Sequence, residues 1–153
     1  VADNIALSNY DVLFPGFMIK PSKVMEEADK SIRQLSIKTP DGSTKCMNLS
    51  GGNQQKVVLA KWLMRDLKVL LVDEPTVGID VGSKEEIYEI LREIADRGSI
   101  VIVVSSDTEE LLKISDRIII MVDGKVFDDM PNDNLTADDL LLEASGIRRK
   151  EGA

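Results

Sequence analysis

Residues 49–56 read Leu-Ser-Gly-Gly-Asn-Gln-Gln-Lys, and residues 69–74 read Val-Leu-Leu-Val-Asp-Glu. The first segment places a hydroxyl, on Ser50, and two glycines directly before a helix-length run with apolar periodicity. Ser50 is therefore expected to cap that helix, and the glycines let bare N–H groups approach a phosphate at its N-terminus. The second segment is a continuous apolar run, typical of a strand buried on both faces, and it ends in two carboxylates. Acids at the carboxyl end of a buried parallel strand lie where open α/β sheets bind ligands.

Each segment alone has a plainer interpretation. Ser-Gly-Gly is usually a loop or a helix start, and Asp-Glu-Pro after an apolar strand is often only a turn. Here the two segments occur in this order with a single helix-length run between them. That combination predicts two pieces of phosphate chemistry joined by one helix.

At these residues the sequence resembles the ATP-binding cassette (ABC) ATPases, with Leu49 to Lys56 as the signature motif and Val69 to Glu74 as the Walker B strand. Three further segments resemble one branch of that family more closely: Asn53 to Lys56, Ile37 to Pro40 and Gly78 to Gly82. That branch is the second cassette of the fused, two-cassette ATPases that power bacterial uptake of ribose, xylose and galactose.

The resemblance extends from about Asp3 to Leu142. It implies an α/β fold, a partial P-loop NTPase fold with a mostly parallel sheet, flanking helices and a helical subdomain. Residues 1–48 would belong to the helical subdomain, which in the family receives the coupling helices of the membrane subunit. Residues 49–146 would hold the signature helix, Walker B and the C-terminal part of the nucleotide-binding core, and residues 147–153 would form a tail.

The resemblance also implies a role for each motif residue, with ATP and Mg²⁺ as cofactors of the intact protein. Asp73 would hold Mg²⁺ through a water, and Glu74 would polarise the water that attacks ATP. Adjacent residues at a strand end point in different directions, so they can serve metal and water separately. The signature residues would cover the γ-phosphate of a nucleotide held by another cassette, in trans: Leu49, Ser50, Gly51, Gly52, Asn53 and Gln54. Gly78 and Asp80 would belong to the D-loop, which crosses the interface of that head-to-tail dimer.

One part of the family pattern differs at Ser106. ABC cassettes usually place a histidine after the strand that follows Walker B, and Ser106 stands at that position, between Ser105 and Asp107. Because Ser106 and Glu109 have capping-box spacing, we interpret Ser106 as the cap of the next helix rather than as a catalytic residue. Second cassettes of this branch often share the loss, which leaves open whether this half's own ATP site turns over.

A larger part of the pattern, the phosphate-binding loop, is absent from the sequence. Its pattern G-x-x-x-x-G-K-[ST] occurs nowhere, and Gly78 to Lys84 has the wrong spacing and order. In the family this loop, the adenine-stacking residue and the glutamine loop precede the segments matched here. We therefore expect the C-terminal part of a cassette, which on its own binds ATP weakly and is inactive.

Composition limits the function classes. A net charge of −8 argues against binding the backbone of nucleic acids, which needs basic patches. The single cysteine, Cys46, excludes an internal disulfide, and the absence of histidine removes the commonest metal ligand. The longest apolar runs, Ile100 to Val104 and Ile118 to Val122, are far shorter than the ~20 residues of a membrane-spanning helix, and the first residues do not resemble a signal peptide. Any membrane contact is expected through a partner.

Periodicity and turn signals predict the remaining elements. Trp62 is expected in the core, on an apolar stripe of the helix after Ser50 that packs against the sheet. The aromatic segment Tyr10 to Met18 is either a loop tucked under a helix or a partner-binding patch. The predicted elements are a helix over Ser22–Leu35, a helix from a Ser83–Glu86 capping box to Gly98, a buried strand over Ser99–Ser105, a helix over Asp107–Ile114, a strand over Arg117–Val122, a hairpin turn at Asp123-Gly124 into Lys125–Asp128, and a helix over Thr136–Ala144 closed by Gly146.

The leading hypothesis is an ATP-hydrolysing subunit of a carbohydrate importer, peripheral on the cytoplasmic face of the membrane. Its partners would be an N-terminal cassette, the membrane permease subunits and, indirectly, a periplasmic or extracellular sugar-binding protein. The alternatives are an ABC-type ATPase of DNA repair or translation, and a non-catalytic interaction module. The sequence does not name the sugar, because specificity lies in the binding protein and the permease. Since Val69 to Asp73 is too apolar for a sheet edge, the isolated chain is expected to self-associate, by strand addition or by exchange of elements between copies, or else to rearrange locally so that the edge is covered.

Overall fold

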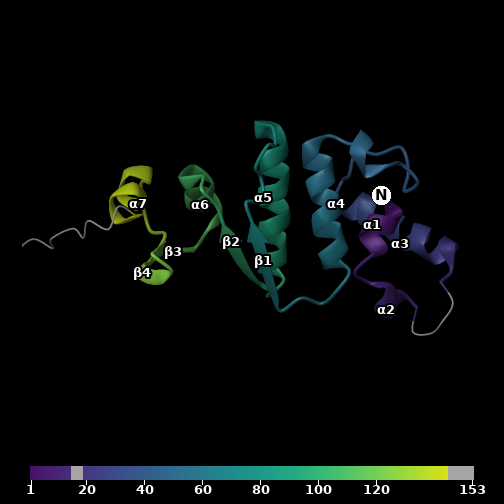
Figure 1. The fold of residues 1–153 in the computed structure, drawn as a ribbon, viewed down its shortest axis with the longest axis horizontal. Coiled ribbons are helices and arrows are strands. Elements are labelled where there is room, and N and C mark those ends of the chain that lie inside the picture. Colours follow the sequence, from purple (N-terminus) through teal and green to yellow (C-terminus); the bar gives the residue numbers. More distant parts are fainter. Residues whose placement is uncertain (15–18, 145–153) are drawn as a thin grey trace, which may run out of the picture. The chain divides into compact units, whose positions relative to one another are not determined.

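The computed structural model describes residues 1–14 and 19–144 (Figure 1). The chain divides into two compact units, Val1–Ile102 and the part from Val103 onward. In chain order the elements are α1 (Ala2–Ala6), α2 (Tyr10–Leu13), α3 (Pro21–Gln34), a 3-10 turn η1 (Cys46–Asn48), α4 (Gly51–Leu63), β1 (Val69–Asp73), α5 (Val81–Asp96), β2 (Ile100–Val104), α6 (Thr108–Ile114), β3 (Arg117–Val122), β4 (Lys125–Pro131) and α7 (Ala137–Ala144). No helix among the described residues is long and apolar enough to cross a membrane.

The first unit begins with a small helical cluster in which α1 packs against α3 and α4. Helix α3 confirms the helix predicted over residues 22–35, and it starts at Pro21 because proline suits the first helical turn. Its buried face includes Val24 and Ala28, and Ile5 of α1 is fully buried. This cluster fixes the segment that leads from α3 toward the signature residues.

Helix α4 buries Val57, Leu59 and Ala60, and its main packing partners are α1 and α5 rather than the sheet. Trp62 is 40% exposed, with the Lys61 ammonium 5.0 Å from its ring centroid. The prediction of a core tryptophan is therefore wrong. Trp62 lies two residues after the buried Ala60 and four after the half-exposed Val58, so it continues the exposed side of the helix.

The β1–α5–β2 segment forms a two-stranded sheet, whose strands begin side by side. The boundary between the two units falls within β2, after Ile102. The Ile100 N–H donates to the Lys68 carbonyl at 2.9 Å, and the Ser99 hydroxyl donates to the Leu67 carbonyl at 2.8 Å. Because each strand starts at the same end of the pair, the strands run parallel, as the strand–helix–strand order predicts. Helix α5, which joins them, buries the expected residues Ile87, Ile90, Leu91 and Ile94.

The two strands are not buried on both faces in this chain, so that part of the prediction is wrong. In β1, Leu70 is 5% exposed, whereas Val69 and Leu71 are 50% and 65% exposed. Ile100, Ile102 and Val104 of β2 are exposed as well. Alternate side chains of a strand point to opposite faces, so one face of β1 is covered and the other is open. We call Val69, Leu71, Ile100, Ile102 and Val104 the open strand residues.

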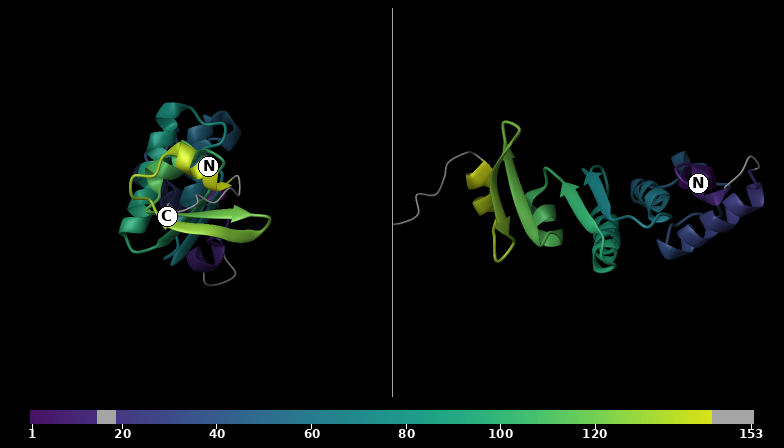
Figure 2. Two further views of the ribbon diagram at one scale, coloured as in Figure 1. Left: turned by 90° about the vertical axis from the view of Figure 1, so that its left-hand side faces the viewer. Right: turned by 90° about the horizontal axis from the view of Figure 1, so that it is seen from below.

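The second unit is built on the antiparallel hairpin of β3 and β4 (Figure 2). Asp123 and Gly124 both have positive φ, 50° and 73°, as a two-residue hairpin turn requires, which confirms the predicted turn. Strand β4 continues to Pro131 rather than ending at Asp128. The extension pairs with the start of β3, where the Arg117 guanidinium binds both carboxylate oxygens of Asp129 at 2.6 and 2.9 Å.

Helices α6 and α7 complete this unit, and α7 packs against both α6 and β3. Ile118, Ile120 and Leu140 form the buried core. The starts of α6 and α7 each fall one residue after the predicted bound. The predicted closure of the last helix by Gly146, the tail at 147–153 and residues 15–18 of the aromatic segment lie outside the described residues.

Candidate functional site

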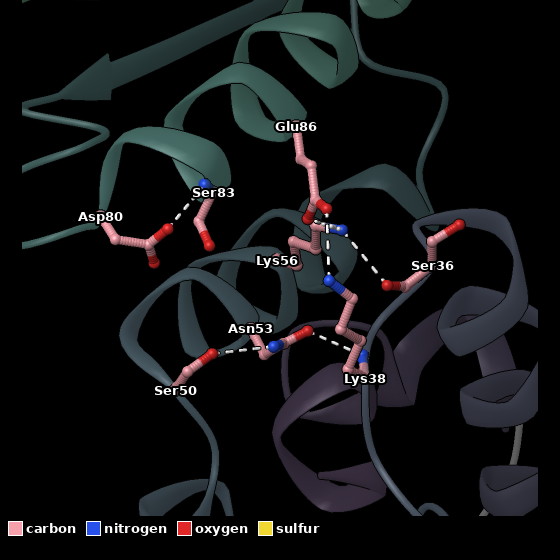
Figure 3. Close-up of polar contacts among 8 residues, drawn as sticks. All are labelled: Ser36, Lys38, Ser50, Asn53, Lys56, Asp80, Ser83 and Glu86. Atoms are coloured by element: carbon pink, nitrogen blue, oxygen red, sulfur yellow. Dashed lines mark hydrogen bonds and ion pairs between the residues drawn. The ribbon is translucent and has the colours of Figure 1, made fainter.

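Ser50 lies at the N-cap position of α4, but its hydroxyl does not cap the helix. The backbone has the extended φ of −62° and ψ of 158° that an N-cap residue adopts, yet the side chain accepts no bond from the first-turn N–H groups. Instead, Nδ2 of Asn53 lies 2.8 Å from Ser50 Oγ (Figure 3). The prediction that Ser50 occupies the cap position is confirmed, whereas its hydroxyl is engaged by a side chain. The first N–H groups of α4 have no intrahelical partner. Because the Ser50 side chain does not bond to them, they are available to a ligand.

Asn53 is buried and is held by the segment that follows α3. The Lys38 N–H donates to Asn53 Oδ1 at 2.7 Å. One turn further along α4, the Lys56 ammonium donates to the Ser36 carbonyl at 3.2 Å. Residues three apart lie on the same face of a helix, so Asn53 and Lys56 together attach residues 36–38 to α4.

Lys56 also joins α4 to α5 through a buried charge. Its side chain is 3% exposed, and its Nζ lies 2.8 Å from Oε2 of Glu86, whose side chain is 39% exposed. Lys38 Nζ lies 3.5 Å from the other oxygen of Glu86. The hydrogen bond from Lys56, followed by its charge, lowers the pKa of Glu86 below its ordinary value. The segment 36–38, α4 and α5 therefore meet at one polar junction, made by Lys38, Asn53, Lys56 and Glu86 (Figure 3).

The predicted Ser83–Glu86 capping box is wrong. Helix α5 begins earlier, and Asp80 is its N-cap, with the Ser83 N–H donating to Asp80 Oδ1 at 3.0 Å. Because the helix starts at Val81, Glu86 lies in its second turn and faces Lys56 instead of the helix end. The hydroxyl and N–H of Ser83 lower the pKa of Asp80.

The signature glycines pack directly against the residues that follow Walker B. A Cβ added to Gly52 would lie 2.5 Å from the Ser83 Cβ, and one added to Gly51 would lie 3.5 Å from the Gly78 carbonyl. At Gly52 any larger side chain would push α4 away from the start of α5. The fold thus brings together the predicted signature residues Gly51 and Gly52 and the predicted D-loop residue Gly78.

Asp73 and Glu74 lie where β1 ends. Asp73 is the last residue of the strand and is exposed, and Glu74 has a left-handed φ of 47°. A non-glycine residue in this conformation costs about 1 kcal/mol or more and is common at functional sites. After it the chain turns, and the Ile79 N–H donates to the Thr76 carbonyl at 3.2 Å. The turn leads directly to Asp80 and the start of α5.

A divalent metal ion would find few protein ligands here. Among the described residues, no three His, Cys, Asp or Glu side chains gather as a metal site. A single carboxylate at Asp73 still fits Mg²⁺, which keeps several waters and takes other oxygens from the phosphates of its substrate. For the nucleotide, the uncapped start of α4, with glycines at its first two positions, fits a phosphate group.

Ser106 belongs to the second unit, where the predicted Ser106–Glu109 capping box is wrong. Asp107 is the N-cap of α6, and its carboxylate accepts from the Glu110 N–H at 3.2 Å. Ser105, which precedes the helix, bonds to its start: the Ser105 hydroxyl accepts from the Asp107 N–H and donates to the buried Glu110 carboxylate. The cap is displaced by one residue, which leaves Ser106 exposed ahead of it.

Lys56 and Glu86 were missed as partners by sequence reasoning. Lys56 is the last residue of the signature segment, and it precedes Leu59 and Ala60 by three and four residues on the buried face of α4. A lysine on the buried face of a helix needs a carboxylate partner, and that signal was present in the sequence.

Comparisons with known proteins find similar sequences among the ATP-binding proteins of transporters. The family model described as ABC transporter matches residues 3–77. The xylose import ATP-binding protein XylG of Thermoanaerobacter pseudethanolicus is 46% identical over 146 residues, which are 95% of this chain and 29% of that protein. The ribose import ATP-binding protein RbsA of Bacillus licheniformis is 41% identical over 148 residues, 97% of this chain and 30% of that protein. The chain thus spans less than a third of the length of these relatives.

A solved structure supports the fold class. The ATP-binding cassette MJ0796, in a dimeric post-hydrolysis state with ADP and Pi, has a TM-score of 0.64 and 26% identity to this chain. The match covers 80% of this chain and 52% of the cassette. The predicted α/β fold of an ABC ATPase is confirmed.

Proposed function

The chain belongs to the ABC transporter family of ATP-binding proteins, and we propose that it is the C-terminal part of the ATP-hydrolysing subunit of a bacterial carbohydrate importer. The observation that carries the proposal is the start of α4: a serine hydroxyl left out of the helix cap, next to two glycines packed against the D-loop segment. The xylose and ribose import proteins that the chain resembles support the class of cargo. The individual sugar would be chosen by other subunits.

In this proposal the start of α4 acts in trans. Ser50, Gly51 and Gly52 bind the γ-phosphate of a nucleotide whose other phosphates are held by a partner cassette. The N–H groups at the helix N-terminus and its dipole favour the negative charge there. Leu49, Asn53 and Gln54 complete the signature. Gly78 and Asp80, in the loop packed against the same glycines, lie at the dimer interface.

Asp73 and Glu74 would act on the chain's own nucleotide. Bound Mg²⁺ neutralises charge that develops on the phosphates. Asp73 at the strand end would hold this ion through a water, and Glu74 would orient and polarise the attacking water. Ser106 occupies the position where most cassettes have a histidine, so this site is proposed to turn over more slowly than its partner.

The proposed partners are an N-terminal cassette and the permease subunits, with a sugar-binding protein outside the membrane. The subunit would lie at the cytoplasmic face, held through the permease. Residues 1–48 would supply part of the helical subdomain, residues 49–146 the signature and Walker B part of the core, and residues 147–153 a tail. The open strand residues require a cover from a partner, and alone the chain is proposed to self-associate through them. Light scattering that gives the mass of a monomer at all concentrations would contradict this.

On its own the chain is proposed to be inactive, with weak ATP binding or none. A signature and a Walker B strand provide one metal ligand and no cradle for the α- and β-phosphates, because the phosphate-binding loop pattern is absent. Calorimetric titration with Mg-ATP is the check. Micromolar affinity for the isolated chain would contradict the proposal.

Replacement of the matching segment in the ribose import protein of B. licheniformis tests the function itself. We expect a chimera that carries this chain to hydrolyse ATP and, with its permease and binding protein, to restore ribose uptake. The Ser50→Ala chimera should fold, bind ATP and lose most of this activity, whereas Glu74→Gln should fold, bind ATP and lose only the smaller share that comes from this chain's own, slower site. A well-folded chimera with normal nucleotide binding and no hydrolysis would refute the proposed function.

A further inference from the structure

We propose that Asn53 is a positioning residue that makes the Ser50 hydroxyl a hydrogen-bond donor toward phosphate. This inference rests on the proposed function, in which Ser50 meets the γ-phosphate, and it adds the reason why the hydroxyl is correctly oriented. It depends on three observations: the orientation of the Asn53 amide, the way Ser50 is bonded, and the rigidity of the surrounding junction.

The orientation of the Asn53 amide is fixed by the backbone. The Lys38 N–H can only donate, and it lies 2.7 Å from the Asn53 side chain, so the oxygen of the amide must face it. Rotation of the amide by half a turn would set two donors against each other. The NH₂ group therefore faces Ser50 (Figure 3).

The Asn53 NH₂ group in turn sets the polarity of the serine. A hydroxyl has one proton to donate and two lone pairs to accept with. Asn53 Nδ2 donates to Ser50 Oγ at 2.8 Å and thereby uses one lone pair. The Ser50 proton cannot point at Asn53 and is directed away from it. Among the described residues this is the one hydrogen bond that the Ser50 side chain makes, and Ser50 is exposed.

A phosphate oxygen only accepts hydrogen bonds, so this polarity decides whether Ser50 attracts or repels it. A serine that donated to its neighbour would present lone pairs to the phosphate. With Asn53 as donor, the serine presents its proton at the exposed start of α4. The N–H groups of the first helical turn lie at the same end of the helix and also donate hydrogen bonds. Ser50 is thus prepared for an anion before one arrives.

The junction keeps Asn53 in place. Asn53 is buried. The segment that carries Lys38 makes a second bond to α4, because the Ser36 carbonyl accepts from Lys56, and Lys56 is itself paired with Glu86. A buried amide with partners on both sides has little freedom to rotate. The hydroxyl is therefore oriented at no further cost when a phosphate binds.

Asn53→Asp separates this role from a merely structural one. The new side chain has nearly the same shape and still accepts from Lys38, but it cannot donate to Ser50, whose proton should turn toward the new carboxylate. In the chimera with the ribose import protein, we expect kcat for ATP hydrolysis to fall about 10- to 100-fold, the range for losing one hydrogen bond to a charged group, with a small change in Tm. Gln55→Glu is the matched control, since it adds the same charge to the same helical turn without a bond to Ser50.

A second arm uses the chain itself and does not require hydrolysis. In the Asn53→Asp variant, the introduced carboxyl group should accept from the Ser50 hydroxyl, which lowers its pKa. Adding Ser50→Ala should raise that pKa by about half a unit or more, measured by NMR titration of the carboxyl carbon.

The two experiments distinguish a failure of the inference about Asn53 from a failure of the proposed function. Equal pKa values with and without the Ser50 hydroxyl would overturn the inference, and so would equal losses of kcat in Asn53→Asp and Gln55→Glu. A pKa coupling in the chain, together with a folded but inactive chimera, would refute the proposed function and leave the donor assignment standing.

Discussion

The polar junction and the open strand residues differ in how completely the rest of the chain bonds or covers their side chains. At the junction, Lys38, Asn53, Lys56 and Glu86 find partners from three elements, and no buried side-chain polar atom among the described residues lacks a hydrogen bond. On the strands, by contrast, large apolar side chains such as Val69 and Leu71 remain exposed.

This difference shows which half of the candidate site depends on other parts of a protein. The start of α4 obtains its geometry from contacts inside the unit, so the signature residues are oriented without a partner. The end of β1, which carries Asp73 and Glu74, lies on a pair of strands with one open face. Two strands with an uncovered apolar face are marginally stable, so the Walker B end needs a cover to become rigid.

Leu70→Ala and Leu71→Ala test the comparison most strongly, since the two leucines are adjacent and face opposite sides. We expect Leu70→Ala to lower the free energy of unfolding by about 2–5 kcal/mol, as for a buried leucine, and Leu71→Ala by less than about 0.5 kcal/mol. Urea unfolding of the dilute chain measures both. Equal losses would mean that the side of β1 carrying Leu71 is covered after all.

Glu86→Gln and Lys56→Met test the junction, with a smaller expected effect. Glu86→Gln leaves the ammonium of Lys56 buried without its counter-charge, and we expect a loss of about 1–3 kcal/mol, less than for a fully buried pair because Glu86 is partly exposed. Lys56→Met removes the buried charge itself and should cost only about 1 kcal/mol. If Lys56→Met proved the more damaging change, the ammonium would stabilise the fold mainly through its bond to the Ser36 carbonyl and not through its pairing with Glu86.

The acid dependence of stability is the smallest effect. The pKa of Glu86 is lowered in the folded chain from its ordinary 4.5, so the folded state binds fewer protons than the unfolded state in acid. The stabilisation is complete above the unfolded pKa and is lost as the pH falls through the folded one. The free energy of unfolding should therefore decrease more steeply below about pH 4.5 in the wild type than in Glu86→Gln. Parallel curves would show that the pair does not contribute.

Much of this fold could be predicted from the sequence because its local signals agree with its packing. Helix α3, the β1–α5–β2 unit and the Asp123-Gly124 hairpin follow from periodicity and turn residues. The exposure of Leu71 could not be predicted, since an apolar run indicates that a strand should be covered on both faces and not whether this chain supplies the covering elements. Helix starts were misplaced where several polar residues competed as caps, as with Asp80 over Ser83 and Asp107 over Ser106.

The candidate site was predictable to the level of motifs. Spacing brought Ser50 to a helix start and Asp73 to a strand end, and both lie there. The bond from Asn53 to Ser50 and the pair between Lys56 and Glu86 depend on side-chain geometry and on contacts between residues far apart in the sequence. Such contacts leave little trace in a local pattern.

We propose that the two motifs act at different nucleotide sites, and a measurement of ATP hydrolysis at each site separately can verify this. In the chimera with the ribose import protein, turnover at each of the two nucleotide sites is measured separately for Ser50→Ala and Glu74→Gln. We predict that Glu74→Gln slows hydrolysis at the site formed by this chain and leaves nucleotide binding intact, whereas Ser50→Ala slows hydrolysis of the nucleotide held by the partner cassette. Loss of turnover at the same site in both variants would contradict the claim.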